Sequence, residues 1–380
     1  MRLLYVINGF DPGGAEHGLL TLVEQGFFDG HDLRVLAFCH GRGPLADRIR
    51  AALGDERVLI VNAGNRLSAR ACASGAWAVW QQFRQWRPDV AVLSLKQANV
   101  IGRAVAVFFP AIRCVSFEHI ERYQARRLGW IYQYLLYALS WRVDEIWADC
   151  QQTLDATEQY FTPRARRRFV VPLFAAQDHP VKAGYDPAGP FRVAAAGRLV
   201  ARKNFGALID AAAELAAHRT LYVDIFGDGP GRAALDARIQ RAGLAECVRL
   251  HGYRSDWLEA ATAADVFVNL SDNEGFCIVV AEAMSAGLPV VATNVGGIRE
   301  YGIDRTNILT LPEADPGRVV ATLDALSRDP GRRAALGRAA RTHMRRLYAP
   351  EAFRQRGREI FDREEQTPDV YQDAATVRPA

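Results

Sequence analysis

The sequence lacks the features that mark membrane-spanning, disulfide-stabilised and zinc-binding proteins. It has only six cysteines, with no CxxC pair and no histidine at zinc-ligand spacing. Its most apolar run, 100–115, is interrupted by Arg103, Pro110 and Arg113, so we expect no transmembrane span. The apolar start, Leu3–Ile7, is too short for a signal peptide and suits a buried strand. These absences favour a cytoplasmic protein with reduced thiols.

The chain also has little net charge. Its formal charge of +4 at pH 7 is too small to indicate a nucleic-acid partner, and we expect none. Two basic runs stand out, one at Arg126 and Arg127 and one at Arg164 and 166–168. Each run is either an ordinary solvated face or a surface that binds anions.

Length and hydrophobic patterning predict an α/β protein with two domains. A chain of 380 residues fits two cores of roughly 150 to 190 residues each. Short apolar runs that alternate with helical patterns are typical of parallel sheets covered by helices on both faces. The predicted strands are 3–7, 33–38, 58–61, 90–95, 113–117, 145–148 and 169–172 in the first half, and 192–196, 221–226, 248–250, 266–270, 289–293 and 308–310 in the second.

Composition places the domain boundaries. We expect a first domain over 1–172, a linker rich in Pro and Gly over 173–190, and a second domain over 191–347. A last helix, 348–363, is expected to return to the first domain, and 364–380 has the composition of a frayed tail.

Two loops between a strand and a helix are candidate anion sites. Gly13 and Gly14 follow the first strand, and glycines there let the backbone approach an anion at the helix start; a purely structural turn is the alternative. Arg198 and Lys203 follow the strand 192–196, at the end where open α/β sheets bind ligands. Their expected ligand is a diphosphate, and a solvated basic loop is the alternative.

Two glutamates form the third candidate site. Glu282 lies among apolar residues of a predicted helix, and a buried carboxylate needs a hydrogen-bonding partner such as the vicinal hydroxyls of a ribose. Glu274, at the mouth of that helix, could accept hydrogen bonds from a sugar or simply stabilise the helix N-terminus. A glycosidase pair is the other alternative, although the eight-residue separation favours contacts with different parts of one ligand.

These motifs together resemble glycosyltransferase family 4. The resemblance covers essentially the whole chain and is sharpest over 193–300. It rests on the following segments: Gly13-Gly14-Ala15-Glu16, Gly197-Arg198-Leu199 with Lys203-Asn204, Gly227-Asp228-Gly229-Pro230, Glu274-Gly275-Phe276 through Glu282-Ala283-Met284, and Gly287–Thr293.

The resemblance implies a GT-B fold, in which two Rossmann-like domains face each other across a cleft and the C-terminal one holds a nucleoside-diphosphate sugar. It implies that Arg198 and Lys203 bind the diphosphate, Glu282 the ribose and Glu274 the donor sugar. The implied cradle is completed by Gly13, Gly14 and the backbone of Gly275, Phe276 and Cys277, and base contacts are expected near Gly227 and Tyr253.

The resemblance also places a histidine near the anomeric carbon. His119 is the best match, and a structural histidine is the alternative. The implied catalytic set is therefore His119, Arg198, Lys203 and Glu274. The sequence departs from the family pattern at Cys277, where a glycine is frequent, and at His17, where an arginine is frequent.

The expected reaction is transfer of a sugar, with retention of configuration, from a UDP-, GDP- or ADP-sugar to a glycan or lipid-linked glycan. No motif offers a covalent nucleophile, and no DxD pair suggests a catalytic metal. A sugar-nucleotide epimerase and a non-catalytic nucleotide-sugar-binding subunit are the alternatives. An aromatic stripe, Trp130, Tyr134, Tyr137 and Trp141, belongs either to the core or to a surface that docks on the inner face of a membrane.

Overall fold

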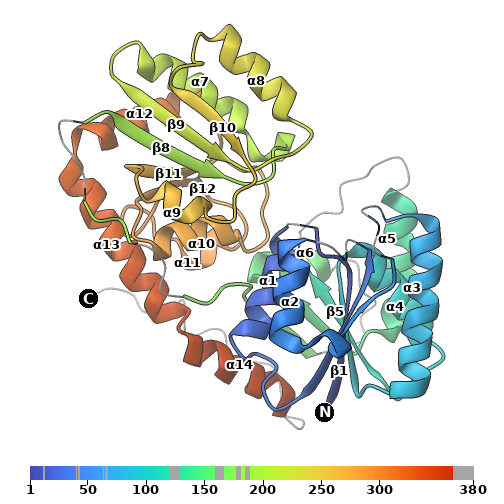
Figure 1. Cartoon of the computed structure of the whole chain (residues 1–380). Helices are drawn as coiled ribbons and strands as arrows, with labels where there is room; N and C mark the ends of the chain where they lie inside the picture. The colour runs from blue at the N-terminus through green and yellow to red at the C-terminus, as the bar shows by residue number, and fades with distance from the viewer. Residues whose placement is uncertain are drawn as a thin grey trace. The chain divides into compact units, whose positions relative to one another are not determined.

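The structure is a computed structural model that describes residues 1–362, except 12, 40, 42, 63, 65–66, 120–128, 159–166, 177–180 and 185–188. It divides into two compact units (Figure 1). The first combines Met1–Ala175 with the described chain from Pro350 onward, and the second is Ala176–Ala349. Among the described residues, no helix combines the length and hydrophobicity needed to cross a membrane.

The first unit is built on a parallel seven-stranded sheet in the order β3-β2-β1-β4-β5-β6-β7. In the five inner strands nearly every residue is buried, because helices cover both faces of the sheet. The strands are β1 (Arg2–Gly9), β2 (Asp32–Cys39), β3 (Val58–Ile60), β4 (Val90–Ser94), β5 (Arg113–Glu118), β6 (Glu145–Ala148) and β7 (Arg167–Val170).

Helices form a layer on each face of this sheet. Figure 1 shows α1 (Gly14–Glu24) and α2 (Pro44–Leu53) on one face, and α3 (Ala69–Gln81), α4 (Lys96–Ala106) and α5 (Gly129–Ala138) on the other. Within the layers α1 packs beside α2, α3 beside α4, and α4 beside α5. The helix α6 (Gln151–Glu158) connects β6 to the segment before β7.

The last described helix, α14 (Pro350–Asp362), packs on the first unit although it follows the second in sequence. The ring of Phe361 lies 6.0 Å from Phe28 and 5.7 Å from Trp147, centroid to centroid. The backbone of Gly357 touches Phe27 so closely that a Cβ would lie 2.0 Å from the Phe27 carbonyl oxygen. Aromatic burial and this backbone contact therefore hold α14 in place.

The second unit repeats the architecture with a parallel six-stranded sheet, in the order β10-β9-β8-β11-β12-β13. Its core contains Val193, Ile225 and Val268 from the strands and Leu208 and Ile209 from the helix after β8. The strands are β8 (Phe191–Ala196), β9 (Leu221–Phe226), β10 (Val248–Gly252), β11 (Val266–Asn269), β12 (Val290–Thr293) and β13 (Leu309–Leu311). The helices are α7 (Phe205–Ala216), α8 (Arg232–Arg241), α9 (Trp257–Ala261), α10 (Ile278–Ser285), α11 (Ile298–Tyr301), α12 (Pro316–Arg328) and α13 (Pro330–Leu347).

The predicted strands are confirmed, with ends that shift by one or two residues. The largest shift is at β7, which begins at Arg167 because Arg167 and Arg168 pair with Glu145 and Ile146 of β6. Arg167 also lies 3.2 Å from the Glu145 carboxylate, so this part of the basic run is structural. The other basic residues, 126, 127, 164 and 166, lie outside the described residues, as does part of the expected linker.

The order of strands in each sheet indicates where a ligand is expected to bind. In each unit the chain reverses its direction of winding between two neighbouring strands, β1 and β4 in the first unit and β8 and β11 in the second. Loops diverge from the carboxyl ends of such strands, and the crevice between them is where open α/β sheets bind ligands.

We expect Gly357→Ala to lower the free energy of unfolding by roughly 1 to 3 kcal/mol, because its Cβ would overlap the Phe27 carbonyl. Gly317→Ala, at an exposed position of α12 whose nearest atom lies at 3.5 Å, is the matched control. It should leave stability unchanged or raise it by up to about 1 kcal/mol. Thermal and urea unfolding of the full chain measure both. Equal effects of the two variants would contradict the contact.

Candidate active site

A buried ion pair lies at the reversal point of the second unit, between the loops that follow β8 and β11. Lys203 ends the short helix η4 (Ala201–Lys203) and donates to Glu274, 71 residues later. Both side chains are nearly excluded from solvent, with exposed fractions of 10% and 7%. Arg202 lies 3.9 Å from the other carboxylate oxygen, and the Asn269 amide lies 3.4 Å from the first. The structure thus brings together two predicted site residues and adds two that the sequence analysis missed.

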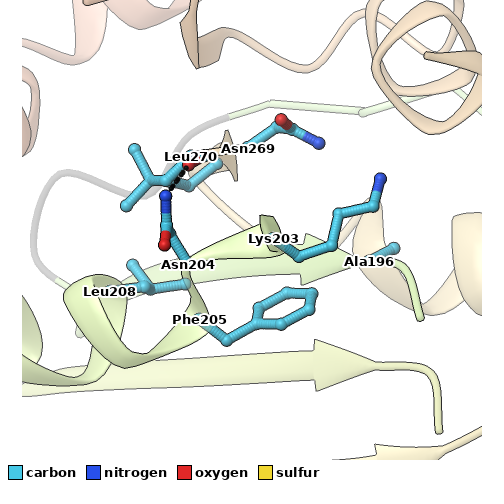
Figure 2. Close-up of a pocket in the computed structure, with 8 residues that line it drawn as sticks. Ala196, Lys203, Asn204, Phe205, Leu208, Asn269 and Leu270 are labelled. Atoms are coloured by element: carbon cyan, nitrogen blue, oxygen red, sulfur yellow. Dashed lines mark hydrogen bonds between the residues drawn. The ribbon is translucent and has the colours of Figure 1, made fainter. Parts of the chain in front are cut away.

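Asn204 positions this pair. It has a left-handed backbone, with φ of 50°, and its side-chain amide donates to the Leu270 carbonyl at 3.0 Å. Figure 2 shows this bond, with Lys203 and Asn269 lining the same small hollow. The bond ties the start of α7 to the end of β11, so Lys203 and Glu274 are held side by side.

The electrostatics of Glu274 are set by its neighbours. Burial by itself raises the pKa of the carboxyl, but the charge and hydrogen bond of Lys203, helped by Ser271 and Arg202, outweigh it and lower the pKa below 4.5. Glu274 is therefore ionised at neutral pH. It is an acceptor for a bound hydroxyl or cation, and it is not a proton donor.

Arg198 differs from Lys203. Its side chain is exposed, and it makes no hydrogen bond or ion pair with any of the residues that the structure describes. It follows Gly197, whose φ of 146° is open to glycine and is rare for other residues. A cation without a partner among the described residues, at the carboxyl end of β8, is suited to binding an anion.

The loop before α10 is clamped from the other side by residues that the sequence analysis did not single out. The Gly297 amide donates to the Gly275 carbonyl at 2.7 Å, and the Tyr301 hydroxyl donates to the carbonyls of Phe276 and Cys277, both at 3.1 Å. At Gly296 a Cβ would lie 2.2 Å from the Gly275 oxygen. The carbonyls therefore point toward this clamp. The Val280 amide donates to the Cys277 carbonyl at 3.2 Å, whereas the amides of Ile278 and Val279 make no hydrogen bond to the described chain and are suited to binding an anion.

Cys277 precedes α10 with a left-handed backbone, φ 64° and ψ 65°. This conformation explains why a glycine suits the position. The thiol is buried, 3.5 Å from the Asn269 amide, and burial raises its pKa well above 9. It is therefore a packing group and not a nucleophile.

Glu282 lies in α10 with a half-buried side chain. Its carboxyl makes no hydrogen bond or ion pair with the rest of the described chain. Burial raises its pKa from 4.5 to about 8. An unpaired, desolvated carboxyl in an apolar helix is unfavourable for the fold alone and suits a ligand that supplies hydroxyl groups.

Glycines after β9 serve close backbone packing. At Gly227 (φ 132°) a Cβ would lie 2.0 Å from the Gly197 oxygen, and at Gly229 it would lie 2.6 Å from the Leu199 oxygen. The Gly227 amide donates to the Gly252 carbonyl at 2.7 Å, and Tyr253 follows with an exposed ring. The role of Gly227 in the structure is thus to join the loops after β8, β9 and β10.

The first unit places its predicted site residues at its own reversal point. Gly13 caps α1, and its carbonyl accepts from the amide and the ring of His17. A Cβ at Gly14 would meet nothing within 4 Å, so packing does not require that glycine. Asn8, at the end of β1, donates to Gln97 at 2.7 Å and accepts from the Ala98 amide at 2.9 Å, which joins β1 to α4.

His119 is buried at the carboxyl end of β5. Its Nε2 lies 2.8 Å from the Ser94 hydroxyl, and its Nδ1 lies 3.9 Å from the Asp149 carboxylate. Burial lowers the pKa of the ring to about 3, so the histidine is neutral at physiological pH. A neutral ring held by Ser94 can exchange one hydrogen bond with a ligand, but it is not a cation.

Most of the second unit matches a family model. Residues 183–343 match the family model described as glycosyl transferases group 1. The chain is 29% identical to the lipopolysaccharide core biosynthesis glycosyltransferase LpsD of Rhizobium meliloti, over 47% of this chain and about half (51%) of that protein's length. It is also 29% identical to a GDP-mannose-dependent alpha-mannosyltransferase of Mycolicibacterium smegmatis, over 79% of this chain and 81% of the relative.

Structural comparison gives the same fold over both units. The crystal structure of HepE from Anabaena, in complex with UDP and glucose, aligns with a TM-score of 0.76 and covers 95% of this chain and 99% of its own. At 20% identity this likeness concerns the fold alone. The two Rossmann-like sheets and this likeness confirm the expected GT-B fold.

We expect the pH dependence of stability to report on Glu282. Because its folded pKa is raised from 4.5 to about 8, ionisation costs stability progressively as pH rises through this interval. Glu282→Gln cannot ionise, so its melting temperature should equal that of the wild type below pH 4.5 and exceed it above pH 8. Glu313→Gln, at an exposed glutamate, is the control and should not change this profile. Parallel profiles for all three proteins would contradict the raised pKa.

We expect Cys277→Gly to be more stable than Cys277→Ala by about 1 kcal/mol, because only alanine retains the cost of a left-handed backbone. Both variants lose the same thiol, so their difference isolates the backbone. Urea unfolding of the two proteins measures it. An alanine variant as stable as the glycine variant would contradict the observed φ.

Proposed function

We propose that the chain is a retaining glycosyltransferase that takes its sugar from a nucleoside-diphosphate donor. The proposal starts from the match of residues 183–343 to the family model of glycosyl transferases group 1. The observation that carries this proposal is the anion site at the end of β8. Arg198 has no partner among the described residues, and the buried Lys203–Glu274 pair lies between the loops that follow β8 and β11. The M. smegmatis relative is named for its dependence on GDP-mannose, which supports a donor of this class.

The proposed donor spans the carboxyl edge of the second sheet. Arg198 and Lys203 bind the diphosphate, with the amides of Gly275, Phe276 and Cys277 completing the cradle. Glu282 accepts from the ribose hydroxyls, which accounts for a carboxyl that lacks a protein partner. Glu274, ionised and fixed by Lys203, accepts from a hydroxyl of the sugar, while Tyr253 offers an exposed ring for the base.

Catalysis in this proposal is electrostatic. Negative charge grows on the diphosphate as the glycosidic bond breaks, and cations and amides fixed before the reaction stabilise that charge most in the transition state. The departing diphosphate and the attacking hydroxyl lie on the same face of the sugar, so configuration is retained. We propose that no metal is required, since Arg198 and Lys203 supply the positive charge.

The acceptor side is proposed to lie on the first unit. His119, neutral and bonded to Ser94, contacts a hydroxyl of the transferred sugar, and the Gly13-Gly14 turn contacts an anionic group. We propose a glycan or a lipid-linked glycan as acceptor, used in the cytoplasm at the inner face of the membrane. The name of LpsD, a glycosyltransferase of lipopolysaccharide core biosynthesis, supports this class.

We expect Arg198→Gln to weaken the binding of nucleoside diphosphates by roughly 10- to 100-fold, because a hydrogen bond to a charged group is worth about 1.5 to 3 kcal/mol. Arg249→Gln, at an exposed arginine of β10, is the matched control and should bind normally. Isothermal titration with UDP, GDP and ADP measures this. Unchanged binding by Arg198→Gln would remove the diphosphate assignment.

We expect the purified chain to leave a nucleotide sugar intact until an acceptor is added. A thermal-shift panel of UDP-, GDP- and ADP-sugars first identifies the donor, because a ligand of the native state raises its melting temperature. Donor turnover is then followed with and without acceptor glycans extracted from the cell envelope. Interconversion of donor sugars without acceptor would identify an epimerase, and binding without any turnover would identify a non-catalytic subunit.

A further inference from the structure

The outer helical layer of the first unit exposes aromatic side chains. On α5 and the short helix η3 (Ser140–Arg142), Trp130 is 65% exposed, Tyr134 65%, Tyr137 48% and Trp141 45%. Their spacing of three and four residues places them on one stripe. The alternative that this stripe belongs to the core is therefore wrong. Leu136, on the opposite side of α5, is the residue that packs inward.

The exposed aromatics continue beyond α5. Phe108, directly after α4, is 67% exposed and stacks edge-on against Trp80 of α3, with ring centroids 5.4 Å apart. Trp77, one turn earlier on α3, is 62% exposed. The helices α3, α4 and α5 pack side by side in one layer (Figure 1). The exposed rings are therefore carried by neighbouring elements of that layer. Monomeric soluble proteins seldom expose so many large rings on one side.

The same layer has no acidic residue. The segments 69–88, 95–117 and 129–143, which contain α3, α4, α5 and η3, include no Asp or Glu. Their exposed charges are cationic, at Arg70, Arg84 and Arg87. The layer on the other face of the sheet differs, since α1 carries Glu16 and Glu24 and α2 carries Asp47.

We infer that the α3–α4–α5 layer docks on the surface of an anionic membrane. Trp and Tyr have an apolar ring and a polar tip, and this combination favours the boundary between lipid headgroups and acyl chains. Helices without carboxylates avoid placing negative charge against anionic headgroups, and exposed arginines are attracted to those headgroups. A protein partner would not require acidic residues to be absent from the entire layer. Only the use of a lipid-linked acceptor rests on the proposed function, and docking itself does not.

Docking is tested by sedimentation of the full chain with vesicles of phosphatidylcholine, alone or mixed with anionic phosphatidylglycerol. The wild type should bind the anionic vesicles and bind the neutral ones far less. The double variant Trp130→Ser/Trp141→Ser should bind at least roughly tenfold more weakly, since burial of a large side chain is worth about 1.5 to 3 kcal/mol. Ile303→Ser, at a 48% exposed apolar residue of the second unit, is the control and should bind normally.

A charge pair at one position tests the electrostatic part. Tyr137→Glu and Tyr137→Lys remove the same ring, but only the first adds the negative charge that the layer lacks. The glutamate variant should lose binding to anionic vesicles, and the lysine variant should retain it. Equal behaviour of the two variants, or no binding by the wild type, would overturn the proposal.

Size-exclusion chromatography of the same proteins tests whether a second copy of the chain, instead of a membrane, covers this layer. If the wild type is a dimer and Trp130→Ser/Trp141→Ser is a monomer, the layer is an interface between two copies and the membrane proposal is wrong. An unchanged oligomeric state, together with lost vesicle binding, supports it. These measurements contain no sugar nucleotide, so a failure of the transferase proposal leaves their outcome unaffected.

Discussion

The buried contact between Lys203 and Glu274 is the interaction on which the candidate site of the second unit depends. A buried charge is costly unless it is paired, and each of these residues removes that cost for the other. The pair also joins the loop after β8 to the loop after β11, where the sheet changes its direction of winding. The same two side chains therefore stabilise the crevice and place charge in it, so the proposed diphosphate would share Lys203 with Glu274.

The two units use different kinds of side chain to join the segments at the reversal point of the sheet. In both units two side chains join the segments on either side of the reversal point. In the second unit they are the ions Lys203 and Glu274, and in the first unit they are the neutral amides of Asn8 and Gln97. Its histidine is also neutral, because burial lowers the ring pKa to about 3. The cations of the second unit suit a charged donor, and the neutral His119 with Ser94 suits the hydroxyl groups of a sugar acceptor. This difference supports the proposed assignment of the donor to the second unit.

Sequence reasoning worked where the signal is local. Apolar runs predicted every strand of both sheets, and Lys203 and Glu274 were expected on loops that follow strands, where the structure has them. It did not predict their pairing, because residues separated by 71 positions share no local sequence pattern that indicates a contact. The clamp formed by Tyr301 was missed for the same reason, although the two glycines after β12 were a usable signal. The aromatic stripe of α5 was ambiguous because helical periodicity identifies a face without saying whether it points inward.

Glu274 and Glu282 show how one helix and its preceding loop give two carboxyl groups opposite properties. Three polar neighbours lower the pKa of Glu274, while burial without a partner raises that of Glu282 to about 8. A fold optimised only for stability would gain from a neutral or apolar residue at position 282, since ionisation there is unfavourable. A ligand that donates two hydroxyl hydrogen bonds reverses this balance, because it replaces the water that the carboxylate lost. We propose that a bound ribose recovers this cost at Glu282, which would link donor binding to the stability of α10.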